Sequence, residues 1–288
     1  LEIIRNNREL HERGLLIELD AYKFRVYVNF RQVEDNEWRQ YAHVAAYLGG
    51  GSVPSIDETV KEIFLAPVHA PYRELVNAGM LQWVISNRIT ATGITTNALA
   101  ALDEVETKTG YLIHAIQALL NQDSAPATIA SSVRNKLAAA LHLPTFEVSH
   151  PSNDPSYRSA IRYLLELTNN KSGTKLSPGK VSAGDPITWG TLLTWAFTHA
   201  LGQAHSPSGY EEISRAWIDE WMLGRIFASA LRDMGISDPD AWRAVGIVRI
   251  LTRHHTWWQP APVSTPESAE SYTKDTSLIP PAATSVLR

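Results

Sequence analysis

The pattern of apolar and polar residues changes near residue 34. Before that point a short apolar run, Leu15 to Leu19, is followed by apolar residues that alternate with mainly polar ones: Tyr22, Phe24, Val26, Val28 and Phe30. Alternation with period two predicts strands with one buried face. Two strands alone are marginal in water, so we expect residues 1–34 to be the C-terminal strands of a truncated β-sandwich domain.

From residue 35 onward the apolar residues follow helical spacing. Asp35 or Asn36 is a plausible N-cap, and the Gly49-Gly50-Gly51 run ends that first helix. Ser55 with Glu58 forms a capping box that starts a second helix. Pro67 and Pro71 are expected to punctuate the sequence after it. Further helices are expected at 95–107, 111–120, 128–141, 155–167, 185–201, 210–234 and 238–255.

These signals predict a mainly α fold, a bundle-like helical region preceded by a short β-hairpin that ends a β-sandwich. We expect a first helical subdomain at 35–168 and a second at 185–258. Residues 169–184 are rich in turn formers and are expected to be a linker loop. Residues 259–288 are rich in proline and serine and are expected to be a disordered linker. Both chain ends resemble the middle of a longer sequence, so we expect a fragment.

Composition narrows the function classes. The chain has 288 residues, no cysteine and a net charge of -4, with acidic and basic residues interspersed. Disulfides and thiolate sites are thereby excluded, and nucleic-acid binding by phosphate neutralisation is disfavoured. No apolar run reaches the ~18 residues of a membrane span. We expect a soluble protein of a reducing compartment, the cytoplasm, although a secreted protein without cysteine is also compatible.

The spacing of the histidine and acidic residues does not suggest a metal site or a catalytic site. His199 and His205 are six residues apart, and His254 and His255 are adjacent, so neither pair has the spacing of two metal ligands on one helix face. We expect surface or helix-end histidines, with no metal and no cofactor. Acidic clusters that could serve glycoside hydrolysis are expected on solvated helix faces; they are Asp103-Glu104-Val105-Glu106, Glu211-Glu212 and Asp219-Glu220.

Nine tryptophans are the one unusual feature of the composition. Trp217 and Trp221 are four residues apart and are expected to form a core stripe. Indole faces also stack on sugar rings or on a partner surface. The candidates for carbohydrate or partner binding are Trp189, Trp195, Trp257 and Trp258, of which the last two adjoin the proline-rich tail.

Three segments carry a resemblance to a known family. Residues 14–33, beginning Gly14-Leu15-Leu16 and ending in Val33, resemble the closing strands of the β-sandwich that follows the barrel in α-amylase-type glycoside hydrolases, family 13. Residues 36–48 and 64–72 are similar to a helical extension after that sandwich in a bacterial subgroup. The family acts through two aspartates and a glutamate on barrel strands. No residue here matches them, so no catalytic residue is carried over.

The resemblance implies a non-catalytic C-terminal part of an α-glucan-acting glycoside hydrolase, with a supporting or interaction role. Its expected partners are an upstream catalytic domain of the same polypeptide and α-glucan, with no nucleic acid and no membrane. The main alternative is a stand-alone helical interaction module with a tryptophan-rich binding face. A free-standing helical enzyme would need a buried polar constellation that periodicity does not reveal.

Overall fold

The computed structural model describes residues 1–17, 19–37, 39–87, 95–122, 126–145, 153–159, 162 and 186–254. Residues 1–253 form one compact unit, and residues 254–288 belong to a second. The linkers expected at 169–184 and 259–288, and the candidates Trp257 and Trp258, lie outside the described residues.

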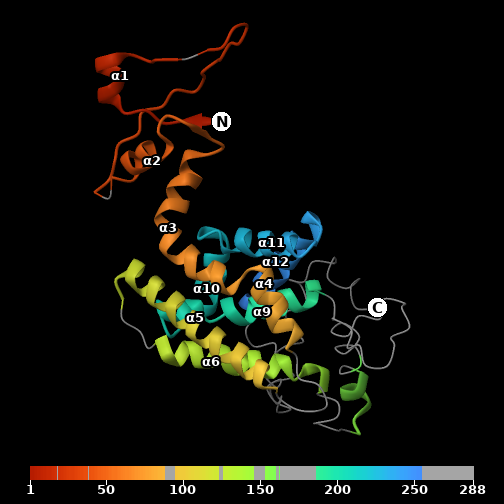
Figure 1. Ribbon diagram of the computed structural model, residues 1–288. Helices are drawn as coiled ribbons and strands as arrows, with labels where there is room; N and C mark the ends of the chain where they lie inside the picture. The colour runs from red at the N-terminus through yellow and green to blue at the C-terminus, as the bar shows by residue number, and fades with distance from the viewer. Residues whose placement is uncertain are drawn as a thin grey trace, which may run out of the picture. The chain divides into compact units, whose positions relative to one another are not determined.

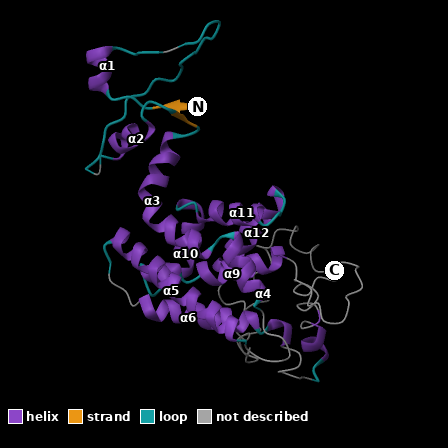
Figure 2. Cartoon of the chain, viewed as in Figure 1, coloured by secondary structure: helices purple, strands orange, loops and turns teal. Residues whose placement is uncertain are grey.

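The described chain is mainly helical, as the sequence predicts (Figures 1 and 2). Two short strands lie near the N-terminus, and 3-10 turns cover Leu143–Thr145 and Leu201–Ala204. In chain order the elements are β1 (Glu2–Ile3), α1 (Asn7–Arg13), α2 (Gln40–Leu48), β2 (Ser52–Val53), α3 (Ile56–Leu75), α4 (Ala78–Ser86), α5 (Thr96–Leu120), α6 (Pro126–Leu141), α9 (Pro186–Thr198), α10 (Tyr210–Glu220), α11 (Leu223–Asp233) and α12 (Asp238–Arg253).

The expected two-stranded antiparallel element is present, but it is built from other residues. β1 pairs with β2, with Glu2 opposite Val53 and Ile3 opposite Ser52. The described residues of 15–33, for which strands are predicted, carry no strand (Figure 2). The sequence therefore predicted a pair of strands but placed them in the wrong residues. A strand forms only where a neighbouring backbone accepts and donates its hydrogen bonds.

Local capping explains where several helices begin and end. The hydroxyl of Ser55 accepts a hydrogen bond from the backbone N–H of Glu58, as the capping box predicts. Gly49 ends α2 in the left-handed region, with φ of 51°. The carboxylate of Asp35 accepts hydrogen bonds from the N–H groups of Tyr41 and Ala42, at 2.8 and 3.0 Å. Asp35 therefore caps α2 across a bend in the chain.

Three predicted helix boundaries are wrong. α3 continues through Pro67 and Pro71, although an internal proline costs about 3 kcal/mol of helix stability. Burial of Val68, Tyr72 and Leu75, each at most 1% exposed, offsets that cost. α5 likewise continues through Gly110 as one helix. The helix expected at 210–234 is instead two helices, because the chain turns at Trp221 and Met222, and Met222 is left-handed with φ of 55°.

One hydrophobic core contains residues from both expected helical subdomains. It extends from Val68 on α3 to Val248 on α12, and α9 lies within it. Every residue of α9 from Trp189 to Thr198 except Leu192 is buried, and α9 packs on α6 and α12. The boundary expected at 169–184 therefore does not separate two cores.

Close backbone packing at Gly202 gives a test of this arrangement. A Cβ at Gly202 would overlap the backbone oxygen of Tyr210 and approach Oγ of Ser214 to 2.9 Å, whereas a Cβ at Gly246 on α12 would meet nothing within 4 Å. We expect Gly202→Ala to lower the free energy of unfolding by about 1 to 3 kcal/mol. Gly246→Ala should raise it by up to about 1 kcal/mol, because alanine is the better helix former and its Cβ has room at this position. Urea unfolding of both variants measures this, and equal effects would contradict the packing at Gly202.

Candidate functional site

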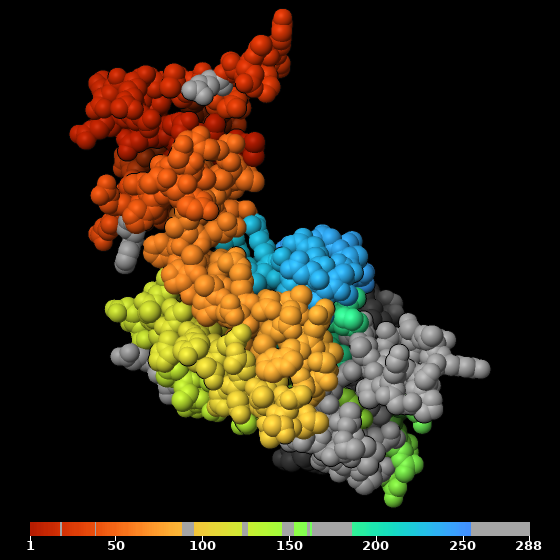
Figure 3. Space-filling model, in the orientation of Figure 1, coloured from red at the N-terminus to blue at the C-terminus, as the bar shows by residue number. Residues whose placement is uncertain are grey.

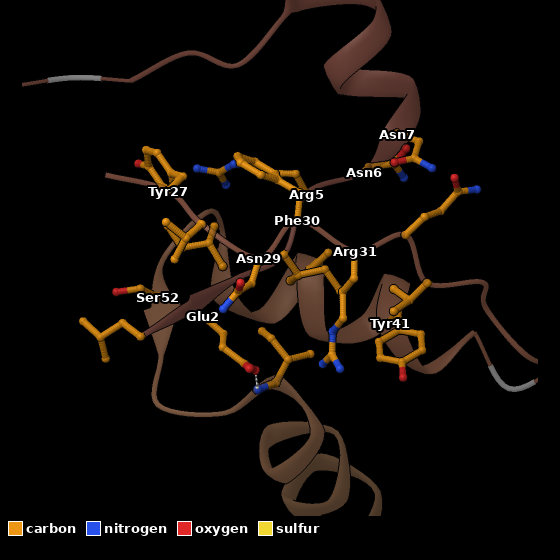
Figure 4. A pocket seen from close by; sticks show the side chains of 18 of the residues that line it. Glu2, Arg5, Asn6, Asn7, Tyr27, Asn29, Phe30, Arg31, Tyr41 and Ser52 are labelled. Atoms are coloured by element: carbon orange, nitrogen blue, oxygen red, sulfur yellow. Dashed lines mark hydrogen bonds between the residues drawn. The ribbon is translucent and has the colours of Figure 1, made fainter. Parts of the chain in front are cut away.

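A hollow of about 1050 Å³ lies between the N-terminal segment and the start of the helical region. Figure 4 shows that its side chains come from residues far apart in the sequence, with Arg5 and Phe30 near each other and Arg31 beside Tyr41. Three arginines line it, Arg5, Arg25 and Arg31. The hollow is thus built mainly by chain without regular secondary structure.

Both acidic side chains of this hollow satisfy helix N-termini. Glu2 accepts a hydrogen bond from the N–H of Ile56 at 2.6 Å, drawn in Figure 4, and Asp35 caps α2. Arg5 donates to the carbonyl oxygen of Gly50 at 3.1 Å, and Arg31 lies 3.5 Å from the carboxylate of Asp57. These contacts hold the N-terminal segment against α2 and α3, and they engage both acidic side chains of the described lining in helix capping.

The side chains of the alternating segment are solvent-exposed. Tyr22, Phe24, Val26, Val28 and Phe30 are between 70% and 105% exposed. They belong to the N-terminal residues drawn in red in Figure 3. Single exposed apolar side chains are ordinary, but five within nine residues make this segment, called below the exposed apolar face, a candidate interaction site.

Of the four tryptophan candidates, the structure describes Trp189 and Trp195. Trp189 is 0% and Trp195 is 7% exposed, and both belong to the hydrophobic core. Neither side chain offers an indole face to an external ligand in this structure. Trp217 and Trp221 stack with ring centroids 3.9 Å apart and an interplanar angle of 9°. Trp217 is buried, as the predicted core stripe requires, whereas Trp221 is only partly buried.

Sequence reasoning missed a buried polar cluster beside Trp195. His199 follows α9, is 2% exposed and stacks on Trp195 with centroids 4.7 Å apart. Its Nε2 contacts Nζ of Lys136 on α6, and its Nδ1 lies 3.0 Å from the carbonyl oxygen of Trp195. A lysine ammonium only donates, so Nε2 accepts and Nδ1 carries the proton. His199 was expected at a surface or helix end. It does follow a helix end, but it is buried.

Burial sets the protonation of this cluster. Desolvation, and secondarily the charge of Lys136, lower the pKa of His199 to about 3. Burial also lowers the pKa of Lys136. On α3, burial lowers the pKa of His69, whose Nε2 donates to the carbonyl oxygen of Trp221 at 2.7 Å. Burial raises the pKa of Tyr72, whose hydroxyl lies 3.1 Å from that of Thr198.

The acidic clusters form ion pairs at the surface. Asp103 pairs with Arg134 at 2.9 Å, and Asp219 pairs with Arg249. Asp103, Glu104, Glu212, Asp219 and Glu220 are exposed, whereas Glu106 and Glu211 are partly buried. Within the described residues, no group of three or more histidines and acidic residues is close enough to hold a metal ion.

Comparisons with protein-family models, with curated proteins and with solved structures gave no match. In the part of the chain that the structure describes, no helix has both the length and the apolar character required to cross a membrane.

The buried His199 predicts loss of stability in acid. Its pKa is about 3 in the folded state and about 6.5 when unfolded, so the unfolded chain binds more protons between these values. The contribution is complete above pH 6.5 and is lost as the pH falls, by at most about 1.4 kcal/mol per pH unit. We expect the free energy of unfolding to fall by roughly 1 to 2 kcal/mol from pH 6.5 to pH 5.

Urea unfolding at several pH values measures this slope. His199→Gln should reduce the slope, while His205→Gln, at an exposed position, should retain it. Some slope should persist in His199→Gln, because the lowered pKa of His69 acts with the same sign. An unchanged slope in His199→Gln would contradict the assignment of a neutral, buried imidazole.

Proposed function

We propose that this chain is the non-catalytic C-terminal part of an α-glucan-acting glycoside hydrolase of the α-amylase type. In this proposal residues 14–33 complete a β-sheet of the preceding sandwich domain, and the helical region has a supporting or interaction role. The observation that carries the proposal is the exposed apolar face of Tyr22, Phe24, Val26, Val28 and Phe30.

The free energies of burial and of backbone ordering explain why this segment needs a partner sheet. Burying one large apolar side chain contributes about 1.5 to 3 kcal/mol, so five contribute roughly 8 to 15 kcal/mol. Ordering the nine backbone residues from Tyr22 to Phe30 costs about 1 to 2 kcal/mol each, a similar total. The free energy gained by burying these side chains therefore only about equals the cost of ordering the backbone. Hydrogen bonds to a neighbouring strand must supply the remaining stabilisation.

Two further observations support a non-catalytic role beside such a domain. Residues 14–33 resemble the closing strands of the sandwich, so the expected partner of this segment is a β-sheet. The acidic clusters on α5 and α10 are positioned on helix surfaces, where Asp103 and Asp219 each form an ion pair with an arginine. These carboxylates act as surface ion-pair partners rather than as a general acid and nucleophile.

The second candidate is a stand-alone helical interaction module. Trp242 and Ile250, both on α12, are 41% and 60% exposed. They favour this candidate, because exposed aromatic and aliphatic side chains on one helix are suited to a protein partner. Trp189 and Trp195, both in the core, do not contribute to such a face.

Dye binding tests the exposed face in the chain itself. The chain should bind the apolar dye ANS, and the double variant Phe24→Ser, Phe30→Ser should lose part of that fluorescence because two of the five apolar side chains of this segment are removed. The double variant Lys23→Ser, Arg25→Ser changes the polar positions of the same segment and should retain the signal. Equal signals from all three proteins would show that the face is covered.

The parent polypeptide provides the direct test of the proposal. An antibody raised against this chain should detect, in its source cells, a species much larger than 31.9 kDa. That species, immunocaptured, should release oligosaccharides from starch, whereas the purified 288-residue chain should release none. A species of 31.9 kDa alone would favour the interaction module, and starch turnover by the isolated chain would overturn the non-catalytic role.

A further inference from the structure

A groove of about 550 Å³ lies where the start of α2 and the middle of α3 meet the turn between α10 and α11. Its apolar lining residues are Val60, Phe64, Leu65 and Trp221, and its polar lining residues are Asn36, Gln40, Lys61 and Glu220. Its volume lies within the range of about 300 to 1,000 Å³ that is typical of small-ligand sites. The groove is separate from the hollow at the N-terminal segment, with which it shares no described lining residue.

The indole of Trp221 is fixed before any ligand arrives. One side is set by the stack on the buried Trp217, 3.9 Å away and nearly parallel. The backbone is fixed as well, because the N–H of Trp221 donates to the carbonyl oxygen of Trp217 at 3.1 Å and its own carbonyl oxygen accepts from Nε2 of the buried His69. A rigid aromatic ring loses little conformational entropy on binding, which favours its use as a ligand platform.

The polar side chains select the chemistry of the ligand. Lys61 is cationic, Glu220 is anionic and Gln40 is neutral, so these three provide hydrogen-bond donors and acceptors with no net charge. A phosphorylated or carboxylated ligand would need an excess of cations. A purely apolar ligand would desolvate these groups without replacing their hydrogen bonds. A neutral ligand that carries hydroxyl groups around an apolar ring face matches both parts of the groove.

We propose that this groove binds a neutral oligosaccharide, with one sugar ring against the indole of Trp221 and its hydroxyl groups hydrogen-bonded to Gln40, Lys61 and Glu220. The choice of an α-linked glucan rests on the function proposed above, whereas the choice of a sugar rests on the groove alone. The site would hold glucan on the helical region, just after the segment 14–33 that resembles the closing strands of the sandwich.

The test uses the whole chain, labelled with ¹⁵N in its indole groups, and titrates it with maltoheptaose and, separately, with cellohexaose. The indole signal of Trp221, assigned from Trp221→Phe, should shift saturably with maltoheptaose. The signal of Trp83, a partly exposed tryptophan on α4 outside the described lining, should not move. Gln40→Ala and Glu220→Gln should each weaken binding about tenfold, the effect of one or two lost hydrogen bonds.

Control variants separate the groove from general effects on folding. Trp83→Phe and Glu9→Gln, at exposed positions away from the groove, should leave binding unchanged. Gln40→Ala and Glu220→Gln change side chains near the surface, so both should fold even if Trp221→Phe does not.

Each outcome decides one part of the proposal. Shifts confined to Trp221 and weakened by the Gln40 and Glu220 variants support the groove. Binding that these variants leave unchanged, or no binding of either sugar, overturns it without bearing on the parent enzyme, which the antibody experiment tests separately. Equal binding of both sugars supports a carbohydrate groove and overturns its preference for α-linked glucan.

Discussion

Burial of α9 is the constraint on which the helical region depends. A helix that is apolar on nearly all sides must be surrounded, and α9 is enclosed by helices from both halves of the chain. Two of its threonines satisfy their buried hydroxyls within the helix, since Thr191 and Thr198 donate to the carbonyl oxygens of Ile187 and Thr194, each at 2.7 Å. His199, just beyond the helix, brings a titratable group into this environment as a neutral ring, and the buried hydroxyl of Tyr72 contacts that of Thr198.

Much of the helical region could be predicted from local signals. Ser55 and Gly49 determine where helices begin and end through hydrogen bonds and backbone angles that involve only neighbouring residues. The prediction at Pro67 and Pro71 failed because the cost of a proline is local. The packing that offsets this cost comes from elements far along the chain, from α5 and, at Tyr72, from Thr198 of α9. Local preference decides a boundary only where tertiary packing does not oppose it.

The break between α10 and α11 shows what periodicity does not reveal. The spacing of apolar residues continues across Trp221 and Met222, so the sequence favours one long helix. In the structure the carbonyl oxygen of Trp221 accepts from His69 on α3, and the N–H of Arg225 donates to the carbonyl oxygen of Met222. A residue 152 positions away thus replaces a helical hydrogen bond. No signal near Trp221 could have located that partner or the groove beside it.

The alternating segment and the groove meet at α2. Asp35, two residues after Val33, caps α2, and Gln40 at the first position of α2 lines the groove. The cap fixes the first turn of α2. A β-sheet that orders residues 22–33 would therefore also restrain Gln40. The cap of Asp35 thus positions the amide side of the groove, whereas the stacked pair of Trp217 and Trp221 takes its geometry from the helical core.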